Sequence, residues 1–393
     1  MKKRLLFVHT SLHFGGAEKS LQTLLCAIDY DRYDVDLLLF RREGELLELL
    51  PPQVRLLDLP RDAQTFSLPF PVSCRTFLRQ GKPLLALSRA RFARAVRGAL
   101  PMRVLEQRGW IYRKTACPAL PQVYDAAIAY LEGSPIYFCA DCVQAKKRIA
   151  VIHSDYRKLE MDRDFDSAYF ARFDTVAGVS DACADVLRSC FPEHRDKIRV
   201  LENIISPGVL RAQSALDAGF DDAYTGLRVL TMGRLDEPKG IDLALEACRM
   251  LSDAPDFRWY ILGDGPQRGM LTERIAQYGL QDRFFLLGAK LNPYSFLAQC
   301  DVYVQPSRFE GKSIALEEAK CFAKPILTTA FTTVRAQITD GVNGVVAQID
   351  PADIAAKLRA LLCDADLRAR LSADLTDYAG NAGEIEKLYA LTE

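Results

Sequence analysis

Short apolar runs alternate with longer amphipathic segments along most of this 393-residue chain. Apolar runs that end in polar or glycine-rich loops indicate buried strands, and apolar positions spaced three and four residues apart indicate helices. We therefore expect strands over residues 3–9, 35–40, 125–131, 147–153, 227–232, 259–262, 284–287, 302–304 and 326–327. This alternation of strands and helices predicts an α/β fold with parallel sheets.

The most informative stretch runs from Val302 to Thr329 and reads as strand, short loop, helix and strand. We expect the helix over Ser313–Phe322, because Pro325 follows it. Ser313, Ile314 and Ala315 would present free backbone N–H groups at the helix N-terminus, which is a natural seat for phosphate. Glu310 lies just before this seat and Glu318 lies inside the helix. Such a layout suits a nucleotide sugar, since a carboxylate on each side of a diphosphate can hold hydroxyl groups.

Glu310 and Glu318 have seven residues between them, and the pair resembles the E-x7-E motif of retaining glycosyltransferases of family 4. The flanking residues add to the resemblance: Glu310 lies in Pro-Ser-Arg-Phe-Glu-Gly, and Lys324-Pro-Ile follows Glu318. Two more loops are similar to that family. One is Gly233-Arg234-Leu with Lys239-Gly240, and the other is Gly263-Asp-Gly-Pro266. Arg234 and Lys239 would stand over the diphosphate as two fixed cations. The resemblance implies these donor-binding residues: Gly16, Gly233, Arg234, Lys239, Gly263, Glu310, Gly311, Lys312, Ser313, Ile314 and Glu318.

The first half of the chain offers a second group of candidate residues. Gly15-Gly16-Ala17-Glu18 follows the first strand and resembles the loop that opens the acceptor-side domain of this family. Glu132 and His153 follow two further predicted strands, where parallel sheets bind ligands. The expected acceptor-side residues are Gly15, Gly16, Glu132 and His153. The expected catalytic residues are Arg234, Lys239, Glu310 and His153.

The family resemblance implies the GT-B fold, in which two Rossmann-like domains with parallel sheets face each other across a cleft. We place an acceptor-side domain at 1–205, a nucleotide-sugar domain at 206–375 and a C-terminal helix that crosses back at 376–393. The small, polar segment Gln213–Thr225 suits a linker. Thr328–Gln337 departs from the family, because many relatives have a Gly-Gly pair and a glutamate here.

A basic segment from Arg75 to Lys114 contains eleven Lys and Arg residues against one acid, Glu106, with leucines interleaved. Such a helical region can lie on an anionic membrane surface or can be a solvated face packed on its domain, and both interpretations stay open. Nucleic acid is the least favoured partner, because no nucleic-acid-binding motif accompanies the charge. The whole chain has a net charge of zero.

Eleven scattered cysteines indicate reduced thiols, since the one CxxC pair, Cys139 and Cys142, has no second pair to complete a zinc site. The start of the chain does not read as a signal peptide, and no segment is long and apolar enough to span a membrane. Asp162-Arg-Asp164-Phe-Asp166 looks like the D-x-D metal motif of another glycosyltransferase fold, but no strand presents it, so we expect surface residues. These features suggest a cytoplasmic protein, and the membrane-binding interpretation of the segment 75–114 would place it at the inner face of a membrane.

The sequence therefore predicts a metal-independent retaining glycosyltransferase of hexosyl or N-acetylhexosaminyl type. It would need no cofactor and would use a nucleotide diphosphate sugar as donor, with UDP favoured over GDP. The acceptor would be a cell-envelope glycan, a polymer or a lipid-linked molecule. Two alternatives stay open: a nucleotide-sugar epimerase of related fold, and a non-catalytic adaptor that kept the fold.

Overall fold

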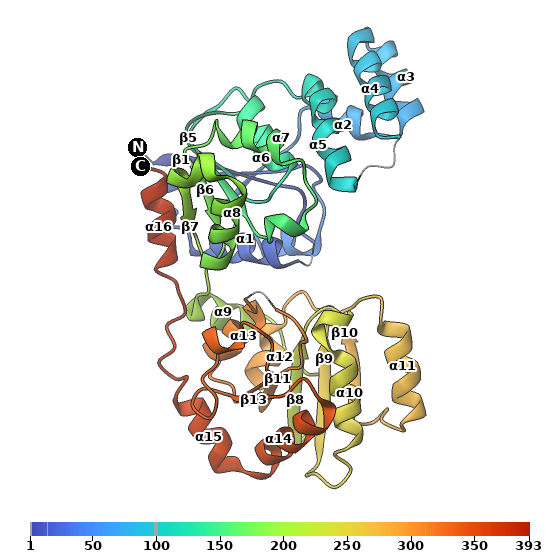
Figure 1. Ribbon diagram of the computed structural model, residues 1–393, viewed down its shortest axis with the longest axis vertical. Helices are drawn as coiled ribbons and strands as arrows, with labels where there is room; N and C mark the ends of the chain where they lie inside the picture. The colour runs from blue at the N-terminus through green and yellow to red at the C-terminus, as the bar shows by residue number, and fades with distance from the viewer. Residues whose placement is uncertain (1, 14, 98–100, 311) are drawn as a thin grey trace. The chain divides into compact units, whose positions relative to one another are not determined.

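The computed structural model describes residues 2–13, 15–97, 101–310 and 312–393 (Figure 1). The chain folds into two compact units. Unit 1 holds the residues up to Ile204 together with Gly383–Glu393, and unit 2 holds Ile205–Ala382. Unit 1 is thus built from two separate stretches of chain.

The centre of unit 1 is a parallel sheet with the strand order β3-β2-β1-β4-β5-β6-β7. Its strands are β1 (Lys3–His9), β2 (Tyr33–Leu39), β3 (Arg55–Leu57), β4 (Val123–Ala129), β5 (Gln144–Ile152), β6 (Thr175–Gly178) and β7 (Ile198–Val200). Leu5, Leu6 and Phe7 are all fully buried, so both faces of β1 are covered. This explains why the sequence shows continuous apolar runs rather than alternation.

Unit 1 also contains helices and 3₁₀ turns, which connect these strands except for the C-terminal helix. They are α1 (Gly16–Ala27), η1 (Glu45–Leu49), α2 (Arg61–Ser67), α3 (Phe70–Arg79), α4 (Pro83–Ala95), α5 (Met102–Arg113), η2 (Lys114–Ala116), α6 (Ser134–Cys142), η3 (Tyr156–Lys158), α7 (Arg163–Phe170), α8 (Asp181–Cys190), η4 (Pro192–Lys197) and α16 (Glu384–Leu391). Strand order reverses between β1 and β4, and ligands of open parallel sheets bind at the carboxyl ends of strands at such a point.

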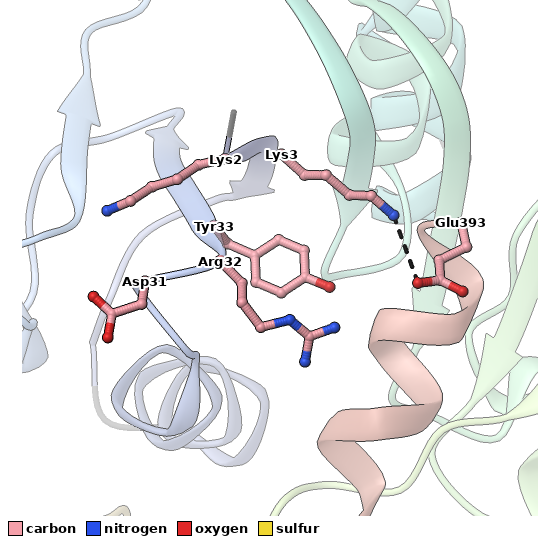
Figure 2. Close-up of a pocket in the computed structure, with 6 residues that line it drawn as sticks. All are labelled: Lys2, Lys3, Asp31, Arg32, Tyr33 and Glu393. Atoms are coloured by element: carbon pink, nitrogen blue, oxygen red, sulfur yellow. Dashed lines mark ion pairs between the residues drawn. The ribbon is translucent and has the colours of Figure 1, made fainter.

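The C-terminal helix α16 packs on the amino-terminal edge of this sheet. Tyr389 stacks on Tyr33 with ring centroids 4.6 Å apart, and the backbone N–H of Asp29 donates to the Tyr389 hydroxyl at 2.8 Å. Figure 2 shows the open hollow beside this contact, where Lys3 pairs with Glu393 at 3.7 Å. Because the hollow lies at the amino ends of β1 and β2, it is a structural junction rather than the expected ligand edge.

Helices α2 to α4 lie at the outer edge of unit 1, where α3 and α4 run side by side (Figure 1). A small separate core of Phe66, Phe77 and Ala86 holds them together. Arg89 belongs to this core and not to a solvated face, since it is buried and its guanidinium lies over the ring of Phe92. The expectation that the basic side chains of 75–114 share one exposed face is therefore wrong for Arg89.

The Asp162–Asp166 segment is also not wholly at the surface. Asp162 caps α7 by accepting from the backbone N–H of Phe165, and Asp166 points inward. The hydroxyls of Tyr137 and Tyr156 each donate to Asp166 at 2.5 Å. Burial raises the pKa of Asp166 to about 6. The surface interpretation was wrong because its two tyrosine partners come from other elements of the fold.

Unit 2 is built around a second parallel sheet with the order β10-β9-β8-β11-β12-β13. Its strands are β8 (Leu227–Met232), β9 (Phe257–Leu262), β10 (Phe284–Gly288), β11 (Val302–Gln305), β12 (Ile326–Thr329) and β13 (Val345–Ala347). The strands predicted in this half are confirmed, and that of β8 is confirmed to the residue. The strand order reverses between β8 and β11.

The helices and 3₁₀ turns of unit 2 are α9 (Pro207–Ser214), η5 (Glu237–Lys239), α10 (Ile241–Arg249), α11 (Arg268–Gln277), α12 (Tyr294–Gln299), α13 (Ile314–Cys321), η6 (Val334–Ala336), α14 (Pro351–Cys363) and α15 (Ala365–Ala373). The predicted linker Gln213–Thr225 is instead anchored to the unit. Gln213 is buried, and Asp222 pairs with Arg228 at 2.7 Å and with Arg258 at 3.1 Å.

Candidate functional site

The loop and helix after β11 form the centre of the candidate site in unit 2. The hydroxyl of Ser313 caps α13 by accepting from the backbone N–H of Leu316 at 3.4 Å. Glu310 precedes this helix start and Glu318 lies within the helix, and both are buried. Buried carboxylates are rare unless they are paired or hydrogen-bonded, so the partners of each glutamate are informative.

Glu310 sits in a dense set of donors. Lys239 Nζ donates to its two carboxylate oxygens at 2.8 and 2.9 Å. The Ser307 hydroxyl and the Gln305 amide donate to Oε1 at 2.7 and 3.0 Å. The carboxylate is therefore fixed in position, and a ligand that binds Lys239 competes with Glu310 for its charge.

Glu318 is held on the inner side of α13. The hydroxyl of Tyr294 donates to its Oε1 at 3.0 Å. Tyr303 lies under the same region, and burial raises its pKa, as do the charges of Glu318 and Glu310. Tyr303 thus lies close enough to both glutamates for each charge to act on it.

One part of the predicted phosphate seat is occupied by the protein itself. The backbone N–H of Ser313 donates to the side-chain oxygen of Gln337 at 2.8 Å, so it is not free. The Gln337 amide also donates to the Ser313 carbonyl at 2.8 Å and to Glu317 Oε1 at 2.7 Å. Gln337 lies in the stretch that departs from the family, and it ties that stretch to the start of α13.

The loop after β8 brings the predicted cations to the same edge of the sheet. Lys239 ends η5 and reaches Glu310, whereas Arg234 is exposed, with Asp236 at 3.7 Å. A Cβ atom on Gly240 would lie 2.0 Å from the Pro306 carbonyl oxygen, and Gly240 has φ +65°. Only glycine fits here, because the loops after β8 and β11 touch through their backbones.

The neighbouring loop after β9 is locked in the same way. A Cβ atom on Gly263 would lie 1.9 Å from the Gly233 carbonyl oxygen. Gly233 in turn packs against the Lys239 side chain, with its Cβ position 3.6 Å from the lysine Cδ. The glycines of the predicted donor loops therefore serve close packing that positions Lys239. Lys312 is exposed, Ile314 is half-buried, and Gly311 lies outside the described residues.

A second cluster lies in unit 1 at the carboxyl ends of β1, β4 and β5. Glu132 accepts from the backbone N–H of His153 at 3.1 Å and from the Ser154 hydroxyl at 2.7 Å. The His153 ring lies 4.9 Å from that of Tyr130. Gly15 precedes α1, and a Cβ atom there would collide with the Glu18 carboxylate at 2.1 Å, while Gly16 is open.

His9 joins this cluster although it was not among the predicted site residues. Its Nδ1 lies 2.8 Å from the Ser11 carbonyl oxygen. Burial lowers the pKa of both His9 and His153 to about 4, so both rings are neutral near pH 7. Within the described residues, the Nε2 atoms of both rings are buried and have no hydrogen-bond partner. An Nδ1–H donated to a carbonyl leaves Nε2 as an acceptor, which is suited to a hydroxyl group.

Two absences concern only the part of the chain that the structure describes. No group of three or more His, Cys, Asp and Glu side chains there could hold a metal ion. No helix there is long and apolar enough to cross a membrane.

Residues 223–375 match the family described as "Glycosyl transferases group 1". The similarity to that family is therefore shown for this stretch, and the rest of the chain lies outside the match. The match covers most of unit 2 and includes both glutamates, Arg234, Lys239 and Gln337.

Curated relatives of this family are similar over part of the chain. The "Lipopolysaccharide core biosynthesis glycosyltransferase LpsE" of Rhizobium meliloti is 27% identical over 210 residues, which cover 52% of this chain and 58% of that protein. The "N-acetylgalactosamine-N,N'-diacetylbacillosaminyl-diphospho-undecaprenol 4-alpha-N-acetylgalactosaminyltransferase" of Campylobacter jejuni is 28% identical over 155 residues, which cover 39% of this chain and 41% of that protein. The chain thus spans about half the length of the curated relatives it matches.

Solved structures extend the similarity to the whole chain at the level of the fold. The structure of Anabaena Alr3699/HepE in complex with UDP-glucose has a TM-score of 0.66 at 17% identity, with 100% of this chain and 99% of that chain covered. The predicted GT-B fold is thereby confirmed, with its two parallel α/β sheets.

Several residues of this candidate site were not among those predicted from the sequence. Gln305 and Ser307 flank Pro306 at the end of β11. Polar residues at the end of an apolar strand are a sequence signal that could have identified both as candidate site residues. Tyr294 and Gln337 contact α13 from 24 residues away in sequence. His9 is the last residue of β1. His153 was predicted because polar residues at the carboxyl ends of parallel strands bind ligands, and the same rule would have identified His9.

Proposed function

We propose that this protein is a retaining glycosyltransferase that moves a sugar from a nucleotide diphosphate sugar to a cell-envelope glycan, polymer or lipid-linked acceptor. The observation that carries the proposal is the buried Glu310 carboxylate bound to Lys239 beside the capped start of α13. A cation, helix N–H groups and two buried carboxylates at one sheet edge suit a diphosphate with hydroxyl groups on either side.

In this proposal Lys239 and Arg234 stabilise the charge that grows on the diphosphate as the bond from the anomeric carbon to the phosphate oxygen breaks. The backbone N–H groups of Ile314 and Ala315 also stabilise this charge, and the Ser313 hydroxyl holds the start of the helix by capping it. The acceptor oxygen bonds to the anomeric carbon on the same face, and its proton passes to the leaving phosphate. No side chain acts as nucleophile, and preorganised charge supplies the main rate effect.

The carboxylates are assigned to the two ends of the donor. Glu310 holds hydroxyls of the transferred sugar, and Glu318 holds those of the ribose. Gly233, Gly263 and Lys312 complete the donor side, together with Gly311. UDP is the nucleotide to test first, because Anabaena Alr3699/HepE, which has the same fold, binds UDP-glucose.

The acceptor side of the proposal rests on unit 1. His153 Nε2 would accept a hydrogen bond from a sugar hydroxyl, and the start of α1 at Gly15 and Gly16 would lie beside it. Glu132 holds the loop that carries His153. The names of the relatives, which refer to a lipopolysaccharide core and to a diphospho-undecaprenol glycan, support testing envelope acceptors.

A donor screen tests this function. The protein is incubated with UDP and GDP sugars, with and without cell-envelope extract, and nucleotide release and the anomeric configuration of the product are measured. Transfer that needs the extract and retains the donor configuration supports the proposal. Turnover of UDP-N-acetylglucosamine without acceptor would instead identify an epimerase, and no turnover with any donor would favour an adaptor.

The roles of the two cations are tested separately. Arg234→Ala and Lys239→Ala should each lower the rate on the order of 10²-fold, because each cation faces charge that develops in the transition state. Their combined effect should be less than additive if both serve one diphosphate. Arg370→Ala, an exposed arginine on α15, is the control. We expect a chelator to leave the rate unchanged, and a rate that vanishes with chelator and returns with Mg²⁺ would contradict a metal-free reaction.

A further inference from the structure

The hairpin of α3 and α4 carries a surface that neither the sheet nor the small core beneath it uses. We call it the hairpin surface and define it by Leu78, Leu84, Leu87, Arg75, Arg91 and Arg94, all of which are exposed. The inward faces of the two helices are occupied by Phe77, Ala86 and the buried Arg89. The hairpin surface is therefore an outward face and not part of a core.

Its apolar part is unusual for a protein surface. Leu84, Leu78 and Leu87 are 79%, 60% and 49% exposed. Of the fourteen large hydrophobic side chains exposed among the described residues, six lie between residues 68 and 87. Single exposed leucines need no explanation, but a group of this kind indicates an interaction site.

The charged part of the hairpin surface has one sign. No Asp or Glu occurs between Asp62 and Glu106. These two bordering acids pair with Lys82 at 2.6 Å and with Arg103 at 3.6 Å. Arg75, Arg91 and Arg94 have no ion pair within the described part of the chain, so their charge is available to an anionic partner.

The sequence spacing of these residues shows where the leucines and the arginines lie along the hairpin. Leu84, Leu87, Arg91 and Arg94 follow one another at intervals of three, four and three, which places them on one face of α4. The rise of a helix puts Arg91 about 10 Å along the axis from Leu84. The leucines are nearest the turn between the helices, and the arginines lie farther from it.

The turn itself is fixed. The backbone N–H of Lys82 donates to the Phe77 carbonyl at 2.9 Å, and that of Gly81 donates to the Leu78 carbonyl at 3.1 Å. Gly81 takes the left-handed conformation with φ +70° that this ending of a helix requires. Leu78 and Leu84 therefore flank a rigid turn, and their exposure is not a consequence of loose chain.

We propose that the hairpin surface binds a bilayer that contains anionic phospholipids, with the leucines in the headgroup and acyl boundary and the arginines at the level of the phosphates. Apolar side chains at a membrane interface enter it by roughly 5–10 Å. If the hairpin enters with its turn first, the leucines reach this depth while Arg91 and Arg94, farther along the axis of α4, stay at the level of the phosphates. Arginines keep their charge in water or on phosphate while their stems lie on apolar surface. An acidic protein surface would satisfy the arginines but not the exposed leucines.

Vesicle cosedimentation tests the proposal without using the enzymatic reaction, so its outcome is separate from that of the proposed function. The probes are vesicles of 40% phosphatidylglycerol in phosphatidylcholine and vesicles of phosphatidylcholine alone. We expect binding to the anionic vesicles at low salt and weaker binding at high salt. Arg91→Gln with Arg94→Gln should lower partitioning on the order of tenfold or more. Leu84→Gln with Leu87→Gln should lower it by a similar factor.

Matched controls are available elsewhere on the chain. Arg195→Gln with Arg370→Gln changes the net charge equally at exposed positions, and Leu216→Gln changes a leucine that is 74% exposed. Both controls should bind as the unchanged protein does. Equal loss in the arginine variant and its control would show a non-specific charge effect and would overturn the proposal.

A fluorescence measurement locates the contact. Both native tryptophans, Trp110 and Trp259, are buried, so Leu84→Trp adds a reporter at the surface. Its emission should shift to the blue on anionic vesicles and be quenched by brominated acyl chains, whereas Leu216→Trp should not respond. Absence of vesicle binding at low salt overturns the proposal. So does an oligomer of this chain that Leu84→Gln with Leu87→Gln dissociates, since a second copy would then cover the leucines.

Discussion

At the residue scale, the two glutamates of unit 2 differ in how they are held. Lys239, Ser307 and Gln305 converge on Glu310, whereas Glu318 accepts a hydrogen bond from the neutral hydroxyl of Tyr294. Glu310 is thus part of a charge pair that a diphosphate can rearrange. We expect the same substitution to have different consequences at the two positions.

Glu318→Ala should weaken donor binding, and Glu310→Ala should lower turnover more than binding. Each lost hydrogen bond to a charged group should cost on the order of 1.5–3 kcal/mol. Calorimetric titration with the donor identified by the screen, together with steady-state rates, measures both effects. Glu273→Ala on α11 is a control outside the site. Unchanged affinity and rate in both variants, with the fold intact, would remove these carboxylates from the proposed site.

The buried titratable groups of unit 1 make stability depend on pH in opposite directions. The pKa values of His9 and His153 fall from 6.5 to about 4, so the unfolded chain binds protons more readily than the folded one between these values. Stability is therefore lost as pH falls from about 6.5 toward 4. The raised pKa of Asp166 works the other way, because its contribution is present below 3.8 and is lost as pH rises through about 6.

We predict that His9→Asn flattens the loss of stability between pH 6.5 and 4, and that Asp166→Asn steepens it. One pKa unit corresponds to about 1.4 kcal/mol. The pKa shifts of His9 and Asp166 therefore each correspond to on the order of 3 kcal/mol in the free energy of unfolding. Thermal unfolding at several pH values measures the effect, with the exposed His13→Asn as control. Parallel pH profiles for His9→Asn and the unchanged protein would contradict the buried neutral histidine.

At the element scale, α13 depends on a side chain that is remote in sequence. Gln337 comes from the end of η6 and binds both backbone groups of Ser313 as well as Glu317. Glu317 also pairs with Lys320 at 3.2 Å and accepts from the Tyr378 hydroxyl. The start of α13 is thus anchored by contacts that do not involve Lys239 or Glu310.

Gln337→Ala should weaken UDP binding, because the helix start that is proposed to face the phosphate loses its anchor. Gln337→Glu should lower thermal stability further, on the order of 1–3 kcal/mol, since a carboxylate cannot donate to Glu317. UDP titration and thermal unfolding of both variants are compared with Gln277→Ala at the exposed end of α11. Tighter UDP binding by Gln337→Ala would show instead that the Ser313 N–H belongs to the ligand.

The sequence predicted those features of the fold and of the candidate site whose signals lie close together along the chain. The strands β1, β8 and β11 and the helix α13 were predictable because their apolar runs, caps and breaking residues lie within a few positions of each other. Asp166 and Gln337 were not, because their environments are made by Tyr137, Tyr156 and Ser313, which only the folded chain brings close. Arg89 was misplaced because a helical charge pattern does not show which charges lie over aromatic rings.

At the scale of the whole molecule, the two units differ in how the chain builds them. Unit 2 is one continuous stretch, Ile205–Ala382, whereas unit 1 needs the returning segment Gly383–Glu393. Leu388 and Tyr389 of α16 are buried against unit 1, and Glu384 accepts from the backbone N–H of Glu202 at 3.2 Å. The stability of unit 1 should therefore depend on residues that lie beyond unit 2 in the sequence.

Tyr389→Ala should destabilise unit 1 and leave unit 2 unchanged. The loss of a buried aromatic side chain costs on the order of 3–5 kcal/mol, and here the stacking on Tyr33 is lost with it. Scanning calorimetry should show one transition moving to lower temperature while another stays. Limited proteolysis with mass spectrometry should release fragments of unit 1 first. Glu386→Ala, exposed on the same helix, should behave as the unchanged protein does. Cleavage that begins within Ile205–Ala382 in Tyr389→Ala would show that the returning helix does not stabilise unit 1 selectively.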